Sequence, residues 1–212
     1  MFGLWKRKAK VGGEIAYHQL EDWWFSTFTA EQREQAAGLY KPMGGSERPL
    51  VEGEIRWSSA SRVKFLTFVS SWFSKPGTRD IALAFADKLA SEINPETPAV
   101  ERHFAYQSLC TIYYRWRDEV PGCFDKAVST CEASVAMAHE LGGVIQFDTG
   151  APEPVSHYCY RQLVVIEKKR GNFERAISLC RQAISEGWRG DWDHRIASMQ
   201  KAQARGQRHN AK

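Results

Sequence analysis

The chain has 212 residues, 43% of them hydrophobic and 25% charged, which excludes collagen-like, disordered and disulfide-scaffold proteins. It has no apolar stretch near the roughly 18 to 20 residues of a membrane-spanning helix. The formal net charge is +4, but nine of the 29 basic residues lie at the two ends. This leaves 20 basic against 25 acidic groups in residues 11–194, which argues against a broad nucleic-acid surface.

The basic ends are predicted to be solvated tails rather than phosphate-binding arms. At the start of the chain they are Lys6, Arg7, Lys8 and Lys10, and at its end Arg195, Lys201, Arg205, Arg208 and Lys212. The five cysteines are odd in number and lack a C-x-x-C spacing, which indicates a reducing compartment. We interpret them as small hydrophobic residues of the core.

Residues 1–58 are predicted to form an irregular, aromatic-rich segment that packs on the helices after it. The aromatic cluster at residues 21–28 fits no single periodicity, and we interpret Trp23 and Trp24 as a structural plug rather than the walls of an acidic pocket. Thr29 and Gln32 match a capping box, which predicts a helix over residues 30–40 that Pro42 ends.

Residues 59–212 carry apolar residues at the helical period of 3.6. The pattern predicts helices near residues 61–74, 81–93, 100–117, 124–141, 156–170 and 173–186. A last helix is expected from Asp191, which suits an N-cap. Almost no stretch alternates with period two, so the predicted fold class is all-α, with one part over residues 1–58 and a second over residues 59–212.

Two parts of the chain resemble each other. Residues 103–112 align with residues 157–166 at an offset of 54, and residues 124–128 align with residues 173–177 at an offset of 49. Small residues that would let paired helices approach closely recur in two sets, Ala82, Ala127 and Ala176, then Ala86, Cys131 and Cys180.

This pattern resembles the tetratricopeptide repeat (TPR), most clearly over residues 100–190. The residues at the family's aromatic, leucine, turn-glycine and small positions are Tyr160, Leu163, Gly171, Phe173, Ala176, Cys180 and Ala183. Val164, Glu167 and Trp188 depart from the family pattern, and the alanine spacings of 45 and 49 exceed the family's repeat of about 34. The resemblance implies a TPR-like α-solenoid of about three helical hairpins with a C-terminal capping helix.

The chain lacks a phosphate-binding glycine loop, an H-E-x-x-H motif, a nucleophile elbow and a Cys/His zinc spacing. We therefore predict no catalytic residue, no metal site and no cofactor. Asp191, Asp193 and His194 are interpreted as partners of a helix start rather than metal ligands. His103 and His157, which the repeat aligns, are interpreted as packing residues.

In the TPR family the first helices of the hairpins line a groove that accepts peptides. The resemblance places in that groove Gln107, Thr111, Tyr114 and Arg115 from one hairpin and Tyr158, Arg161, Lys168 and Lys169 from the next. Their cations and aromatic rings suit an acidic or C-terminal segment of a partner. Thr111 and Val165 stand where the carboxylate-clamp version of the family has asparagine, so that specific clamp is not expected.

These observations predict a cytoplasmic adaptor that binds another protein or peptide and has no chemistry of its own. One alternative is a nucleic-acid-binding adaptor that uses the basic ends. A second is an enzyme whose site lies between the N-terminal segment and the repeats.

Overall fold

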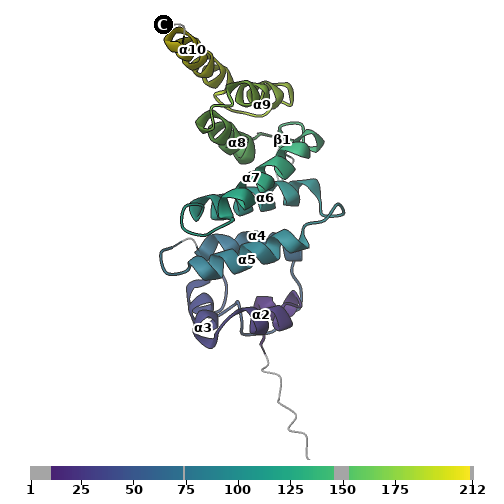
Figure 1. Ribbon diagram of the computed structural model, residues 1–212. Coiled ribbons are helices and arrows are strands. Elements are labelled where there is room, and N and C mark those ends of the chain that lie inside the picture. Colours follow the sequence, from purple (N-terminus) through teal and green to yellow (C-terminus); the bar gives the residue numbers. More distant parts are fainter. Residues whose placement is uncertain (1–10, 74, 146–152, 211–212) are drawn as a thin grey trace, which may run out of the picture. The chain divides into compact units, whose positions relative to one another are not determined.

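The computed structural model describes residues 11–73, 75–145 and 153–210 (Figure 1). Its helices confirm the predicted all-α class. The chain divides into two compact units, Met1–Glu92 and Ile93–Lys212, so the expected N-terminal segment, residues 1–58, shares the first unit with the helices that follow it. The basic run at residues 6–10 and Lys212 lie outside the described residues. No described helix has both the length and the apolar character needed to cross a membrane.

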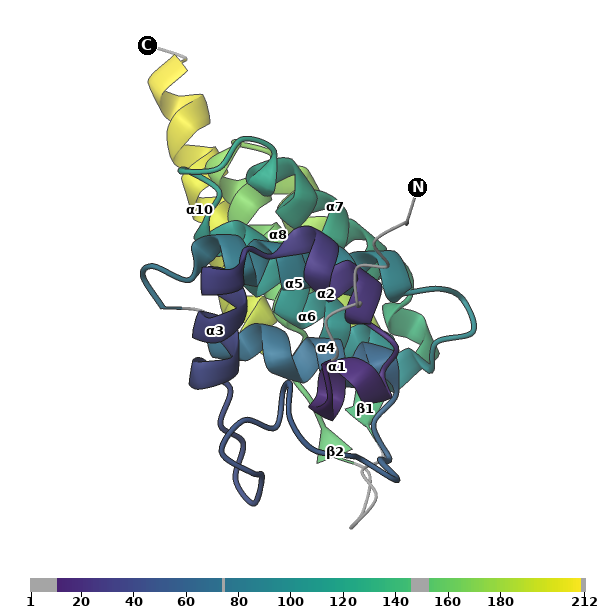
Figure 2. The ribbon, with the colours of Figure 1, turned by 90° about the horizontal axis from the view of Figure 1, so that it is seen from below.

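The first unit is built on a pair of helices, α4 and α5, that pack along each other. Helices α2 and α3 lie on one face of this pair (Figures 1 and 2). The elements of the unit are α1 (Gly13–Tyr17), α2 (Glu21–Thr27), α3 (Ala30–Leu39), α4 (Arg62–Ser70), the 3-10 turn η1 (Ser71–Phe73) and α5 (Arg79–Glu92).

The prediction of an irregular segment before residue 30 is wrong, because α1 and α2 are helical. With five and seven residues, they are too short for an apolar period to appear in the sequence. The start of α1 is fixed by a distant loop, since the backbone N–H groups of residues 12–15 donate to carbonyls of residues 49–53 over 2.8 to 3.1 Å. These bonds satisfy donors that a helix start otherwise leaves without partners.

Side-chain caps start two predicted helices of the first unit, α3 and α4. The capping box of Thr29 and Gln32 is confirmed, with the Gln32 N–H donating to Thr29 Oγ1 over 3.2 Å and the Thr29 N–H donating to Gln32 Oε1 over 3.0 Å. Ser61 caps α4, because its Oγ accepts the Lys64 N–H over 3.0 Å. The Thr29 cap depends only on nearby residues, which explains why the sequence predicts it.

The core of the first unit centres on Phe85 of α5, which is fully buried. Its ring lies 5.1 Å from that of Trp23, 5.5 Å from that of Phe28 and 5.1 Å from that of Phe73, measured between ring centroids. Trp24, four residues before Phe28, is also buried and packs on the Phe28 ring. The aromatic cluster at residues 21–28 therefore packs on the α4–α5 pair.

The second unit consists of consecutive helices that pack on their neighbours (Figure 1). Contacts join α6 to α7, α8 to α9 and α9 to α10, and α8 also contacts both α6 and α7. The elements are α6 (Ala99–Arg115), α7 (Cys123–Ala136), the 3-10 turn η2 (Ala138–Glu140), β1 (Val144–Ile145), β2 (Glu153–Pro154), α8 (Tyr158–Lys169), α9 (Phe173–Ser185) and α10 (Trp192–Asn210). The two short strands pair antiparallel.

Helix α9 ends in a Schellman motif. Gly187 adopts φ +81°, its N–H donates to Ile184 O over 3.0 Å, and the Trp188 N–H donates to Ala183 O over 2.9 Å. Helix α8 ends in the same way at Gly171. Gly171, which the repeat places at a turn, and Gly187, which the sequence analysis did not single out, therefore both turn the chain sharply.

We expect Phe85→Ala to lower the free energy of unfolding by about 3 to 5 kcal/mol, because it removes the ring on which three other rings pack. Phe68→Ala is the matched control. Since the Phe68 side chain is 51% exposed, its loss should cost about 1 kcal/mol. Urea unfolding of both variants measures the two costs, and equal values would contradict a core centred on Phe85.

Gly143 is required where the loop after η2 meets the end of α9. It has φ +70°, and a Cβ added there would lie 2.4 Å from the carbonyl carbon of Gly187. Gly171 has φ +81° but open space around it. Gly171→Ala should therefore cost about 1 kcal/mol from backbone strain, and Gly143→Ala at least about 2 kcal/mol more from the overlap. Thermal unfolding of both variants tests this, and equal midpoints would contradict the close backbone contact.

Candidate functional site

Helix α8 begins at a buried histidine. His157 Nδ1 accepts the backbone N–H of Tyr160 over 3.2 Å, which caps the helix. The His157 ring lies 4.9 Å from that of His103 and 4.5 Å from that of Trp188, and His103 stacks on Trp188. Burial lowers the pKa of His157 to about 4, so the ring is neutral near pH 7 and its Nδ1 can accept a hydrogen bond. The predicted packing role of both histidines is confirmed.

The chain after Trp188 runs beside the start of α8. The Arg189 N–H donates to Val155 O over 3.0 Å, and Ser156 pairs with Arg189 in an isolated parallel bridge. Trp192 Nε1 donates to Trp188 O over 2.7 Å in the buried core. The starts of α8 and α10 are therefore fixed next to each other.

A hollow of about 350 Å³ opens between these two helix starts, and we call it the arginine hollow. Three of its six lining residues are arginines, one from each of α8, the segment before α10, and α10 itself. The lining residues are Ser156, Arg161, Arg189, Gly190, Asp191 and Arg195.

A second hollow of about 230 Å³ lies further along the same two helices, and we call it the aliphatic hollow. Its apolar lining comes from two valines of α8 and a methionine of α10, and it shares two residues with the arginine hollow. The lining residues are Val164, Val165, Lys168, Asp191, His194, Arg195, Ser198 and Met199. Together the two hollows form what we call the α8–α10 groove.

The groove is strongly cationic. Four side chains with a permanent positive charge line it, Arg161, Lys168, Arg189 and Arg195, against the single carboxylate of Asp191. Arg195 Nε donates to Asp191 Oδ1 over 2.7 Å. This hydrogen bond lowers the pKa of Asp191, and the charge of Arg161 acts in the same direction. The groove can therefore accept anionic groups through charge-assisted hydrogen bonds.

The four predicted site residues of α8 lie in three different environments. Arg161 and Lys168 line the α8–α10 groove. Lys169 is exposed but is not among the lining residues. Tyr158 is half-buried beside α6, where burial raises the pKa of its hydroxyl and a hydrogen bond with Thr111 opposes that shift.

The predicted site residues of α6 are on the surface but do not line the groove. Thr111 Oγ1 donates to the carbonyl of Gln107 over 2.8 Å, so this hydroxyl bonds within its own helix. The Arg117 guanidinium lies 4.1 Å from the centre of the Tyr114 ring, and Arg115 is exposed. The structure thus brings together Arg161 and Lys168, but not these four residues of α6, around one groove.

The sequence prediction missed the residues of α10 that face α8, His194, Arg195 and Ser198. The repeat resemblance ends near residue 190, so it placed nothing of α10 in the groove. The spacing of Asp191 and Arg195, one helical turn apart, is the signal that indicates an ion pair at the start of this helix.

Of the residues at the start of α10 that were weighed as metal ligands, Asp191 pairs with Arg195 and His194 lines the aliphatic hollow. Within the described part of the chain, one group of three candidate metal-ligating side chains meets in the core, Cys110, Cys131 and Cys159.

Comparison with known proteins finds no match for this chain among protein-family models, and no significant match among curated proteins or solved structures.

Proposed function

We propose that the second unit is a TPR-like module that binds an acidic segment of a partner protein in the α8–α10 groove, without chemistry of its own. The observation that carries the proposal is the gathering of four cationic side chains and one carboxylate along this groove. Support for the repeat architecture comes from the resemblance over residues 100–190 and from the sequential packing of α6 to α10.

The lining of the groove favours a peptide over a nucleic acid. Val165, partly exposed beside the buried Val164 and Met199, provides an aliphatic contact for an apolar side chain, whereas single-stranded nucleic acids are held by stacking on aromatic rings. The described lining residues of the groove include no Phe, Tyr or Trp, and His194 is their one ring. The alternative of nucleic-acid binding by the basic ends depends partly on residues 1–10, which the structure does not describe.

The positions of the cations suggest the spacing of the acidic residues in the partner. Arg161 and Lys168 are seven residues apart on α8, so they are separated by about 10 Å along the helix axis. An extended peptide covers this distance in about three residues. The groove therefore suits two acidic residues three positions apart, with an apolar residue between them that enters the aliphatic hollow.

A labelled peptide of sequence Gly-Glu-Leu-Val-Glu-Gly is a direct probe of this proposal. We expect the double variant Arg161→Glu, Lys168→Glu to weaken its binding at least about tenfold, because each exposed charge pair contributes up to about 1 kcal/mol and reversal adds repulsion. Fluorescence anisotropy at low salt measures the affinity. Gly-Lys-Leu-Val-Lys-Gly should in turn bind the double variant better than the unaltered chain.

Lys169→Glu is the matched control, because Lys169 is an exposed cation of the same helix outside the groove lining. It should weaken binding clearly less than the double variant does, because Lys169 does not contact the groove and solvent weakens the attraction of exposed charges that are not in contact. Equal losses in the control and the double variant would show a general charge effect and contradict the groove. RNA or DNA binding with a steep salt dependence that the double variant abolishes would favour a nucleic-acid partner instead.

A further inference from the structure

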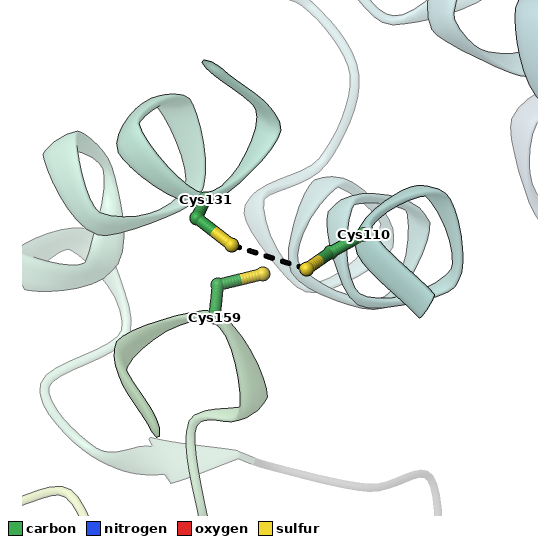
Figure 3. A group of neighbouring side chains, drawn as sticks. All are labelled: Cys110, Cys131 and Cys159. Atoms are coloured by element: carbon green, nitrogen blue, oxygen red, sulfur yellow. Dashed lines mark hydrogen bonds between the residues drawn. The ribbon is translucent and has the colours of Figure 1, made fainter. Parts of the chain in front are cut away.

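Three cysteines from three helices meet in the core of the second unit. Figure 3 shows the sulfurs of Cys110 (α6), Cys131 (α7) and Cys159 (α8) pointing toward one another. All three Sγ atoms lie within 4.8 Å of one another, and those of Cys110 and Cys131 are 3.1 Å apart. Each side chain is at most 1% exposed. This geometry is that of a ligand set gathered around one point.

The sulfur separations suit a single metal ion. Three thiolates at about 2.3 Å from one ion lie about 3.8 Å apart in tetrahedral geometry and about 4.0 Å apart in trigonal geometry. The observed upper limit of 4.8 Å exceeds these values by no more than about 1 Å. The pair at 3.1 Å would have to open by a similar amount, which small rotations about χ1 provide.

The cluster is closed off from solvent together with a hydroxyl group. The Ser134 side chain of α7 is 1% exposed, and its Oγ has no hydrogen-bond partner within the described chain. Thiolates buried this deeply would be costly unless a cation lay beside them.

We propose that Cys110, Cys131 and Cys159 bind one thiophilic closed-shell metal ion, Zn²⁺ or Cu⁺, in a structural site that joins α6, α7 and α8. Thiolates are soft ligands that select these ions over Mg²⁺ or Ca²⁺. Binding replaces the thiol protons, which leave to solvent, and transfers no electrons. The site is separate from the α8–α10 groove, and the proposal does not depend on the groove's function.

Two other buried cysteines of the chain serve as an internal control for the proposed metal site. Cys123 and Cys180 are also buried, at 2% and 0% exposure, but neither belongs to the cluster. If the cysteines only fill space between helices, all five should be equivalent toward metal. If the cluster is a metal site, replacing one of its three cysteines should abolish metal binding. Replacing Cys180 should leave metal binding intact.

The full chain, reduced and kept without oxygen, is titrated separately with Zn²⁺ and with Cu⁺ against a chromophoric chelator. We expect one equivalent of one or both ions to bind, with a rise in the thermal unfolding midpoint because the ion binds the folded state. Cys131→Ala should weaken binding more than about 100-fold, since loss of even an outer partner of a metal site costs about 10- to 100-fold. Cys180→Ala should change the affinity less than about threefold.

The relative affinities of the two titrations decide between Zn²⁺ and Cu⁺. Circular dichroism checks the fold of each variant, and Cys110→Ala and Cys159→Ala replace Cys131→Ala if that variant unfolds. Co²⁺ added to the unaltered chain gives a second readout, because a thiolate-to-cobalt charge-transfer band appears only with sulfur ligands. Absence of a one-to-one complex with either ion would overturn the proposal. Equal loss of affinity in Cys180→Ala would also overturn it.

Discussion

The burial of Trp188 against His103 and His157 is the interaction on which the candidate groove depends. His157 caps α8, and Trp188 follows the glycine that ends α9, so one aromatic cluster fixes the start of α8 and the end of α9 together. The short segment from Trp188 to α10 is held beside α8 by the bridge between Ser156 and Arg189. The side chains of two helices thereby converge on one groove.

This convergence places like charges near one another, which by itself opposes folding. Asp191 offsets part of the repulsion through its bond to Arg195 and its attraction to Arg161. Exposure to solvent limits the rest, because water screens charges at a surface. An anionic segment in the groove would offset the remaining repulsion, and a preformed set of cations would lose little conformational freedom on binding it. The arrangement therefore favours recognition of an acidic partner over a purely structural role.

The sequence predicts what depends on neighbouring residues and misses what depends on distant ones. The cap at Thr29 and the turn glycine Gly171 after α8 follow from local rules, as do the approximate helix limits. Helix α1 was missed because its first N–H groups bond to residues 49–53. The predicted groove used residues of α6 and α8, and of these only Arg161 and Lys168 line the α8–α10 groove, because the repeat ends before α10. The meeting of three cysteines was missed because their spacing matches no motif and only helix packing brings them together.

The central claim is that an acidic segment binds between α8 and α10, and hydrogen–deuterium exchange with the Glu-containing probe peptide tests it most directly. The account predicts slower exchange on peptide addition in the first turns of α8 and α10 and in the segment that joins Trp188 to α10, where the arginine hollow lies. Exchange in α6 should remain unchanged, because its residues do not line the groove. Protection confined to α6, or to the first unit, would contradict the account.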